Sequence, residues 1–85
     1  MRISSDSWFG CTDRDYYEKL LQYLAQNDDE AFKRGLAAGL LTGSCTGFKD
    51  GEPVYIMDTA IFSGLIKVRR GGETMEYWTN LEAVK

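Results

Sequence analysis

The chain has 85 residues with 10 Lys and Arg against 13 Asp and Glu, so its formal net charge at pH 7 is −3. A chain of this length predicts a single domain over residues 1–85, with a modest core. Neither half of the sequence is basic, which argues against binding of DNA or RNA, and no apolar run is long enough to span a membrane.

The sequence contains no histidine. Histidine is the commonest general base and the commonest metal ligand in proteins, so its absence argues against an enzyme and against a metal site, and we expect no cofactor. Two stretches that could suggest chemistry have simpler interpretations. The acids of residues 28–30 are typical of the start of a helix. The glycine-rich residues 42–47 follow a predicted helix and open a predicted strand, which is the reverse of a phosphate-binding loop.

The two cysteines, Cys11 and Cys45, are too far apart for a CxxC motif. The sequence leaves two alternatives open, a disulfide or two buried thiols. A disulfide would indicate an oxidising compartment. Residues 1–8 lack the apolar segment of a secretory signal. The chain as given therefore predicts a cytoplasmic protein, or an extracytoplasmic one if Met1 replaces a removed signal and the disulfide forms.

Residues 1–11 form an arm with two large apolar side chains, Trp8 and Phe9, that need to be buried. Thr12 is the predicted N-cap of a first helix, which runs to about residue 26. The apolar residues of this helix repeat at the spacing of one helical face, and they are Tyr17, Leu20, Leu21 and Leu24.

A second helix follows, with Asn27 or Asp28 as its cap, and it ends at about residue 41. Two glycines, Gly35 and Gly39, weaken this helix by about 1 kcal/mol each relative to alanine. We therefore expect another element to pack closely against the helix at these two positions. The predicted apolar face consists of Phe32, Leu36, Ala37 and Leu40.

After residue 41 the apolar pattern changes from helical to alternating. The change predicts four strands, at residues 43–48, 54–58, 65–70 and 74–79. Between them we expect a tight turn at 49–53, with a positive φ at Gly51, and an apolar loop at 60–64. The chain is predicted to end in a helical turn over residues 80–85.

Alternation also predicts where side chains of the last two strands point. Lys67 and Arg69 alternate with apolar residues, so they should face solvent as in any half-buried strand. Tyr77 and Trp78 are neighbours, so one must face inward and the other outward. The double glycine between these strands predicts a two-residue hairpin turn of the primed type.

Three segments, "GEPVYIMD", "GLIKVRRGGETMEYWT" and "LEAVK", resemble the strands of bacterial SH3-like small β-barrel domains. The resemblance covers residues 43–85. It implies an α+β fold in which an N-terminal helical hairpin over residues 12–41 is followed by an SH3-like small antiparallel β-barrel of four to five strands. Domains of this family bind rather than catalyse, so the resemblance implies a non-catalytic interaction module that recognises a protein or peptide partner.

The sequence holds more aromatic residues than so small a core is expected to enclose. Arg, Tyr and Trp are enriched at the hot spots of protein interfaces. We therefore predict a partner-binding surface on the loop at 60–64 and the following hairpin, and a homodimer through exposed aromatics is compatible with it. An alternative is that the large rings close the ends of the core. The predicted surface consists of Ile61, Phe62, Arg69, Arg70, Tyr77 and Trp78.

A second functional class also fits the acidic balance of the chain. In this alternative the protein is a small acidic inhibitor or immunity protein that blocks a partner enzyme by charge mimicry. Its complex would depend strongly on salt, because exposed charges are screened. The acids that would carry it are those of the two predicted helices, namely Asp13, Asp15, Glu18, Asp28, Asp29 and Glu30.

Overall fold

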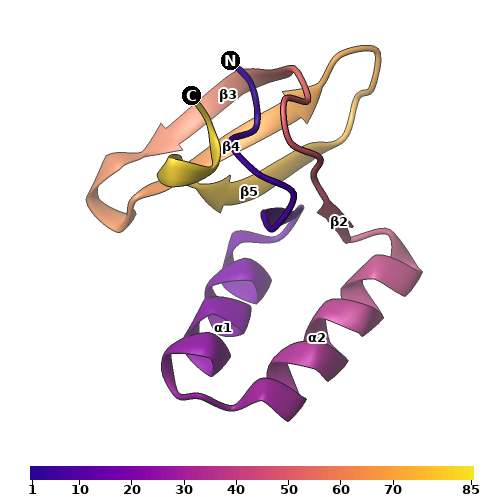
Figure 1. Cartoon of the computed structure of the whole chain (residues 1–85), viewed down its shortest axis with the longest axis vertical. Coiled ribbons are helices and arrows are strands. Elements are labelled where there is room, and N and C mark those ends of the chain that lie inside the picture. The colour runs from indigo at the N-terminus through magenta and orange to yellow at the C-terminus, as the bar shows by residue number, and fades with distance from the viewer.

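The computed structural model describes the backbone of all 85 residues and every side chain except that of Ile61. It has the predicted α+β class, with two helices lying together on one side of a five-stranded antiparallel sheet (Figure 1). Short 3₁₀ turns occupy Ile61–Ser63 and Leu81–Ala83. In chain order, the main elements are β1 (Phe9–Cys11), α1 (Arg14–Ala25), α2 (Asp29–Thr42), β2 (Cys45–Gly47), β3 (Val54–Ala60), β4 (Leu65–Arg70) and β5 (Glu76–Asn80).

The sheet is open, and its strand order is β2-β1-β5-β4-β3. A closed barrel would pair the two outer strands, but β2 and β3 are the edges here. The structure also corrects the predicted order of elements. The arm at residues 1–11 supplies β1, which lies between β2 and β5, so the helical hairpin connects two neighbouring strands instead of preceding the sheet. A strand of three residues that are all buried shows no alternation by which sequence could reveal it.

The N-cap of α2 agrees with the sequence prediction, and the N-cap of α1 does not. Of the two caps predicted for α2, Asn27 and Asp28, the structure has Asp28, whose carboxylate accepts a hydrogen bond from Ala31 N at 3.2 Å. The cap of α1 is Asp13, whose carboxylate accepts from Asp15 N, and not Thr12. The backbone N–H of Thr12 instead donates to Ser44 O at 2.7 Å, which extends the pairing of β1 with β2.

A hydrophobic cluster lies on each side of the sheet. On the side away from the helices, the N-terminal segment and the C-terminal turn lie across the sheet (Figure 1), and Trp8 and Val84 pack against the buried residues Ile3, Phe48, Val54, Ile66, Val68 and Tyr77. On the helix side, the buried residues are Phe9, Cys11, Tyr17, Leu20, Cys45 and Leu65. The alternation of β4 explains this division, because Leu65 and Ile66 point to opposite faces.

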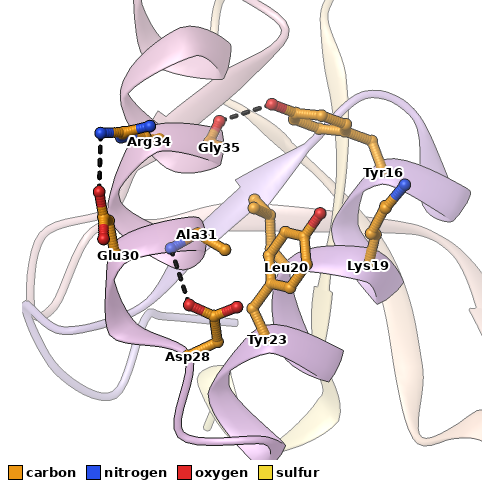
Figure 2. A pocket seen from close by; sticks show the side chains of 9 residues that line it. All are labelled: Tyr16, Lys19, Leu20, Tyr23, Asp28, Glu30, Ala31, Arg34 and Gly35. Carbon is orange, nitrogen blue, oxygen red and sulfur yellow. Dashed lines mark hydrogen bonds and ion pairs between the residues drawn. The ribbon is translucent and has the colours of Figure 1, made fainter.

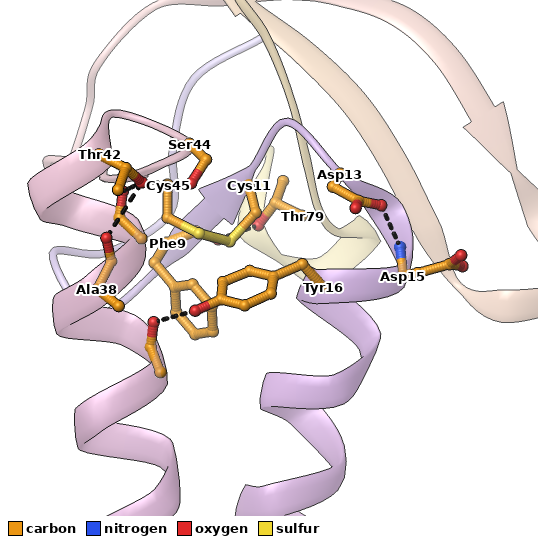
Figure 3. The surroundings of a disulfide bond; sticks show 12 residues. Phe9, Cys11, Asp13, Asp15, Tyr16, Ala38, Thr42, Ser44, Cys45 and Thr79 are labelled. Atoms are coloured by element: carbon orange, nitrogen blue, oxygen red, sulfur yellow. Dashed lines mark hydrogen bonds between the residues drawn. A yellow bond between two sulfur atoms is a disulfide. The ribbon is translucent and has the colours of Figure 1, made fainter.

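A disulfide joins Cys11 at the end of β1 to Cys45 at the start of β2, and the two residues lie opposite each other in the strand register. Figure 3 shows Phe9 and Tyr16 beneath it, facing α2. Gly39 of α2 lies against the disulfide so closely that a Cβ there would be 2.5 Å from Cys45 Sγ. At Gly35 a Cβ would be 2.6 Å from Leu20 Cδ2. The close approach predicted at both glycines is confirmed.

The hairpin between β4 and β5 is longer than predicted. Residues 71–75 separate the two strands, and Arg70 O accepts a hydrogen bond from Glu73 N at 3.2 Å. Of the two glycines, only Gly72 has a positive φ, at 81°. A type I′ turn needs positive φ at both central residues and a type II′ turn needs it at the first, so this turn is not of the primed type. In the part of the chain that the structure describes, no helix combines the length and apolar character needed to cross a membrane.

The disulfide can be tested by mass and by stability. Under denaturing conditions without reductant, we expect reduction to increase the intact mass by two hydrogens. Because the bond closes a loop with a sequence separation of 34, replacing both cysteines by serine should lower the free energy of unfolding by about 4 kcal/mol. Urea denaturation measures this loss. An intact mass that reduction leaves unchanged would contradict the bond.

The packing of α2 on the disulfide predicts a position-specific effect of Gly39→Ala. The added methyl group would lie 2.5 Å from Cys45 Sγ and 2.9 Å from Cys45 Cβ, and the disulfide keeps these atoms from moving away. We therefore expect a cost in the upper part of the roughly 1–3 kcal/mol range for overpacking, against a helix-propensity gain of about 1 kcal/mol. The net loss in the free energy of unfolding should be about 1–2 kcal/mol, measured by urea denaturation. Gly47→Ala is the matched control, because nothing lies within 4 Å of its added Cβ. Equal stability of the two variants would contradict this packing.

Candidate binding surface

The strand register places the predicted surface residues on different sides of the sheet. Tyr77 lies opposite Val68 and faces the cluster away from the helices, whereas Trp78 lies opposite Lys67 and faces the helix side. Arg70 follows Arg69 on β4, so these two arginines also point to opposite faces. Ile61 has a side chain outside the described part of the structure. The predicted residues therefore do not form one continuous patch.

Two of the predicted residues serve the architecture. Tyr77 is buried, and its ring meets Phe48 edge to face at a centroid distance of 6.2 Å. Arg70 binds three groups: its Nε donates to Glu52 Oε2 at 2.5 Å, its Nη1 to Thr46 Oγ1 at 2.9 Å and its Nη2 to Gly47 O at 2.6 Å. Arg70 thereby connects β4 to β2 and to the turn before β3. Its Nε–H group is used in the hydrogen bond to Glu52 and is not available to a partner.

The remaining predicted residues belong to a row of cations and aromatic rings on the helix side. Trp78 has the Arg14 guanidinium 5.5 Å and the Lys67 ammonium 5.1 Å from its ring centroid. Arg69 lies 4.9 Å above the ring of Tyr55. Arg14 also lines a hollow of about 530 Å³ together with the fully exposed Phe62. We call the set of Arg14, Tyr55, Phe62, Lys67, Arg69 and Trp78 the cation–aromatic strip.

The cations of the strip differ in how their charges are compensated. Arg14 forms an ion pair with Glu18 at 2.8 Å, and Lys67 forms a longer one with Glu76 at 3.6 Å. Arg69 donates only to carbonyl oxygens, those of Arg70 and Glu73. Glu76 lies opposite Arg69 in the strand register, but among the described residues no carboxylate lies within ion-pair distance of Arg69. Arg69 is thus the cation of the strip that has no ion pair with a described residue, a group whose chemistry suits a carboxylate, and the rings have the chemistry to contact apolar or planar groups.

Sequence reasoning identified Phe62, Arg69 and Trp78 but left Arg14, Tyr55 and Lys67 out of the predicted surface. A signal existed for two of these three residues. Lys67 lies opposite Trp78, and Tyr55 lies opposite Arg69, so a correct strand register would have revealed both stacked pairs. Arg14 begins α1 and reaches Trp78 only through the packing of helix on sheet, for which the sequence carries no local signal.

A second hollow of about 700 Å³ lies between α1 and α2 (Figure 2). Tyr16 reaches across it and donates to Gly35 O at 2.5 Å, and Glu30 on the rim pairs with Arg34 at 2.7 Å. Asp28 at its lower end caps α2. The polar groups of this groove mostly bind within the helical hairpin itself, so it offers a ligand less than the strip does.

The acids that would carry an inhibitory role are largely engaged in their own helices. Asp13 and Asp28 are caps, and Glu18 and Glu30 form ion pairs one turn along the helix. The described residues contain no group of three or more side chains placed to hold a metal ion. No family model, curated protein or solved structure matches this chain. The resemblance to SH3-like domains thus stays a prediction.

The ion pair of Arg70 with Glu52 predicts a dependence of stability on pH. Burial raises the pKa of Glu52, but the hydrogen bonds from Arg70 and from Lys49 N, with the charges of both cations, outweigh it and hold the pKa below 4.5. The unfolded carboxyl group then binds protons more readily than the folded one. The stabilisation is therefore present above the unfolded-state pKa and is lost as the pH falls through the folded-state pKa.

Urea denaturation of the wild type and of Glu52→Gln over a range of pH measures this effect. We expect the variant to be less stable at neutral pH, and the difference to shrink as the pH falls below about 4.5. Asp50→Asn, in the same exposed turn, is a control for general charge removal. A stability difference that stays constant down to low pH would contradict the lowered pKa of Glu52.

Proposed function

We propose that this protein is a non-catalytic interaction module that binds a protein or peptide partner through the cation–aromatic strip. The observation that carries the proposal is the placement of three cations over aromatic rings along one side of the sheet. Stacking restricts these long side chains before a partner arrives. Less conformational entropy is then lost on binding, and Arg, Tyr and Trp are the residue types enriched at interface hot spots.

The chemistry of the strip indicates what the partner presents. Arg69 lies opposite Glu76 but forms no ion pair among the described residues, and Lys67 has only a long ion pair, so acidic side chains of a partner can bind both. Phe62 is fully exposed beside its hollow and supplies an apolar anchor. The partner segment that fits combines Asp or Glu with an apolar residue. The resemblance of residues 43–85 to SH3-like domains, a family that binds rather than catalyses, supports the same class of function.

Selection from a random peptide library displayed on phage tests the proposal. We expect wild-type protein to enrich peptides that contain Asp or Glu next to apolar residues. An enriched peptide, measured by fluorescence polarisation, should lose about tenfold in affinity for the Phe62→Ser/Lys67→Gln double variant, which corresponds to about 1.4 kcal/mol. Circular dichroism first establishes that the variant is folded.

The matched control is Leu41→Ser/Lys33→Gln. It makes the same chemical changes at an exposed leucine and an exposed lysine of α2, outside the strip. This variant should bind the peptide as the wild type does. Enrichment of no peptide, or equal binding by the strip variant and the control, would overturn the proposal.

A further inference from the structure

We propose that the outer edge of β3 pairs antiparallel with β3 of a second copy of this chain, so that the protein forms a two-fold symmetric dimer with one continuous sheet. This inference goes beyond the proposed function and does not depend on it. It rests on the exposure of β3, on the hydrogen bonding of its outer edge, and on two side chains near that edge that lack ionic partners.

β3 is the most exposed strand of the sheet. It lies at one edge, and of its residues only Val54 is buried. Tyr55 is 57% exposed, Ile56 39% and Met57 43%. Neighbouring residues of a strand point to opposite faces, so apolar surface is open on both sides of this edge. Natural proteins usually protect such an edge, and pairing with another strand is one way to cover it.

The outer edge of β3 already accepts a strand-like neighbour at its beginning. Val54 N donates to Met1 O at 3.0 Å, and Arg2 forms an antiparallel bridge with Pro53. In the described backbone this pairing ends at Val54, and no strand pairs with the outer edge of residues 55–60. The edge therefore has a backbone geometry that accepts antiparallel pairing, and most of its length is open to a second strand.

A β-bulge brings the side chains of Tyr55 and Asp58 in β3 to the same face of the sheet. The register shifts between Ile56 and Asp58, so Tyr55 lies opposite Arg69 and Asp58 lies opposite Lys67. Tyr55 and Asp58 therefore both point to the helix side, although they are an odd number of positions apart. Without the bulge, alternation would place them on opposite faces.

The charges at this edge are self-complementary. In the strand register Asp58 lies opposite Lys67 and Arg69 lies opposite Glu76, but Lys67 pairs with Glu76 instead. Asp58 accepts a hydrogen bond from Thr59 N at 2.8 Å, and among the described residues neither Asp58 nor Arg69 has an opposite charge within ion-pair distance. An antiparallel pairing that sets Asp58 of one copy across from Tyr55 of the other brings that carboxylate beside the Arg69 guanidinium stacked on the ring. The two-fold axis repeats the contact, so each copy supplies both halves of the interface.

Sedimentation velocity over a series of protein concentrations measures the dimer directly. We expect a reversible monomer–dimer equilibrium in the wild type. Asp58→Arg and Arg69→Asp should each raise the dissociation constant of the dimer by about tenfold, since the axis repeats each like-charge contact. The double variant carries the exchanged charges and should recover the wild-type value. Asp29→Arg, an equal charge change at an exposed residue in the first turn of α2, away from β3, should leave the dimer unchanged.

Amide hydrogen exchange of the wild type needs no variant. Among residues 55–59, the backbone amides that point to the outer edge should become more protected as the protein concentration is raised through the dissociation constant, whereas those that point to β4 are already paired. A protein that stays monomeric at every concentration, a dimer unaffected by either single variant, or a loss that the double variant does not recover would overturn the proposal. The Phe62→Ser/Lys67→Gln variant should still dimerise, which separates this result from a failure of peptide binding.

Discussion

The short strand β1 connects every layer of this molecule, and its last residue, Cys11, is the point at which the layers meet. Cys11 is bonded to Cys45 of β2, lies opposite Trp78 of β5, and is fully buried. Next to it, Phe9 O accepts a hydrogen bond from the buried hydroxyl of Thr79 at 2.8 Å. Because α1 begins directly after β1 and α2 ends directly before β2, the disulfide holds both ends of the helical hairpin at the sheet.

The position of α2 follows from that constraint. Gly39 contacts the disulfide, and Gly35 contacts Leu20 of α1, so the absence of side chains at both positions lets the helix approach its neighbours. Tyr16 then reaches across to the carbonyl of Gly35. The two helices consequently cover β1 and part of β5 on their side of the sheet. They leave uncovered the ends of β3 and β4 that lie farthest from the helices. The cation–aromatic strip lies along this boundary.

Neighbouring residues of one strand have different roles because the two faces of the sheet differ in their surroundings. Arg70 points to the side where Glu52, Thr46 and Gly47 surround it, and it stabilises the fold. Arg69 points to the helix side, where it stacks on Tyr55 and lies opposite Glu76 without forming an ion pair with any described residue. The peptide-binding and dimerisation proposals both depend on this difference. In the dimer Asp58 of the second copy would occupy Arg69, so the part of each strip left for a peptide would be Arg14, Phe62, Lys67 and Trp78.

Local patterns in the sequence indicated the two helices, a cap of the second helix at residue 27 or 28, a close approach at two glycines, the burial of Ile66 and Val68, and the α+β class, because each leaves a signal in residue type or spacing over a few neighbouring positions. Tertiary structure alone decided the rest. The strand β1 is too short to show a period, the open edge of β3 depends on strand order, and the contact of Arg14 with Trp78 joins distant segments. Whether Tyr77 or Trp78 faces the helices is set by strand register, and a shift of one residue would exchange them.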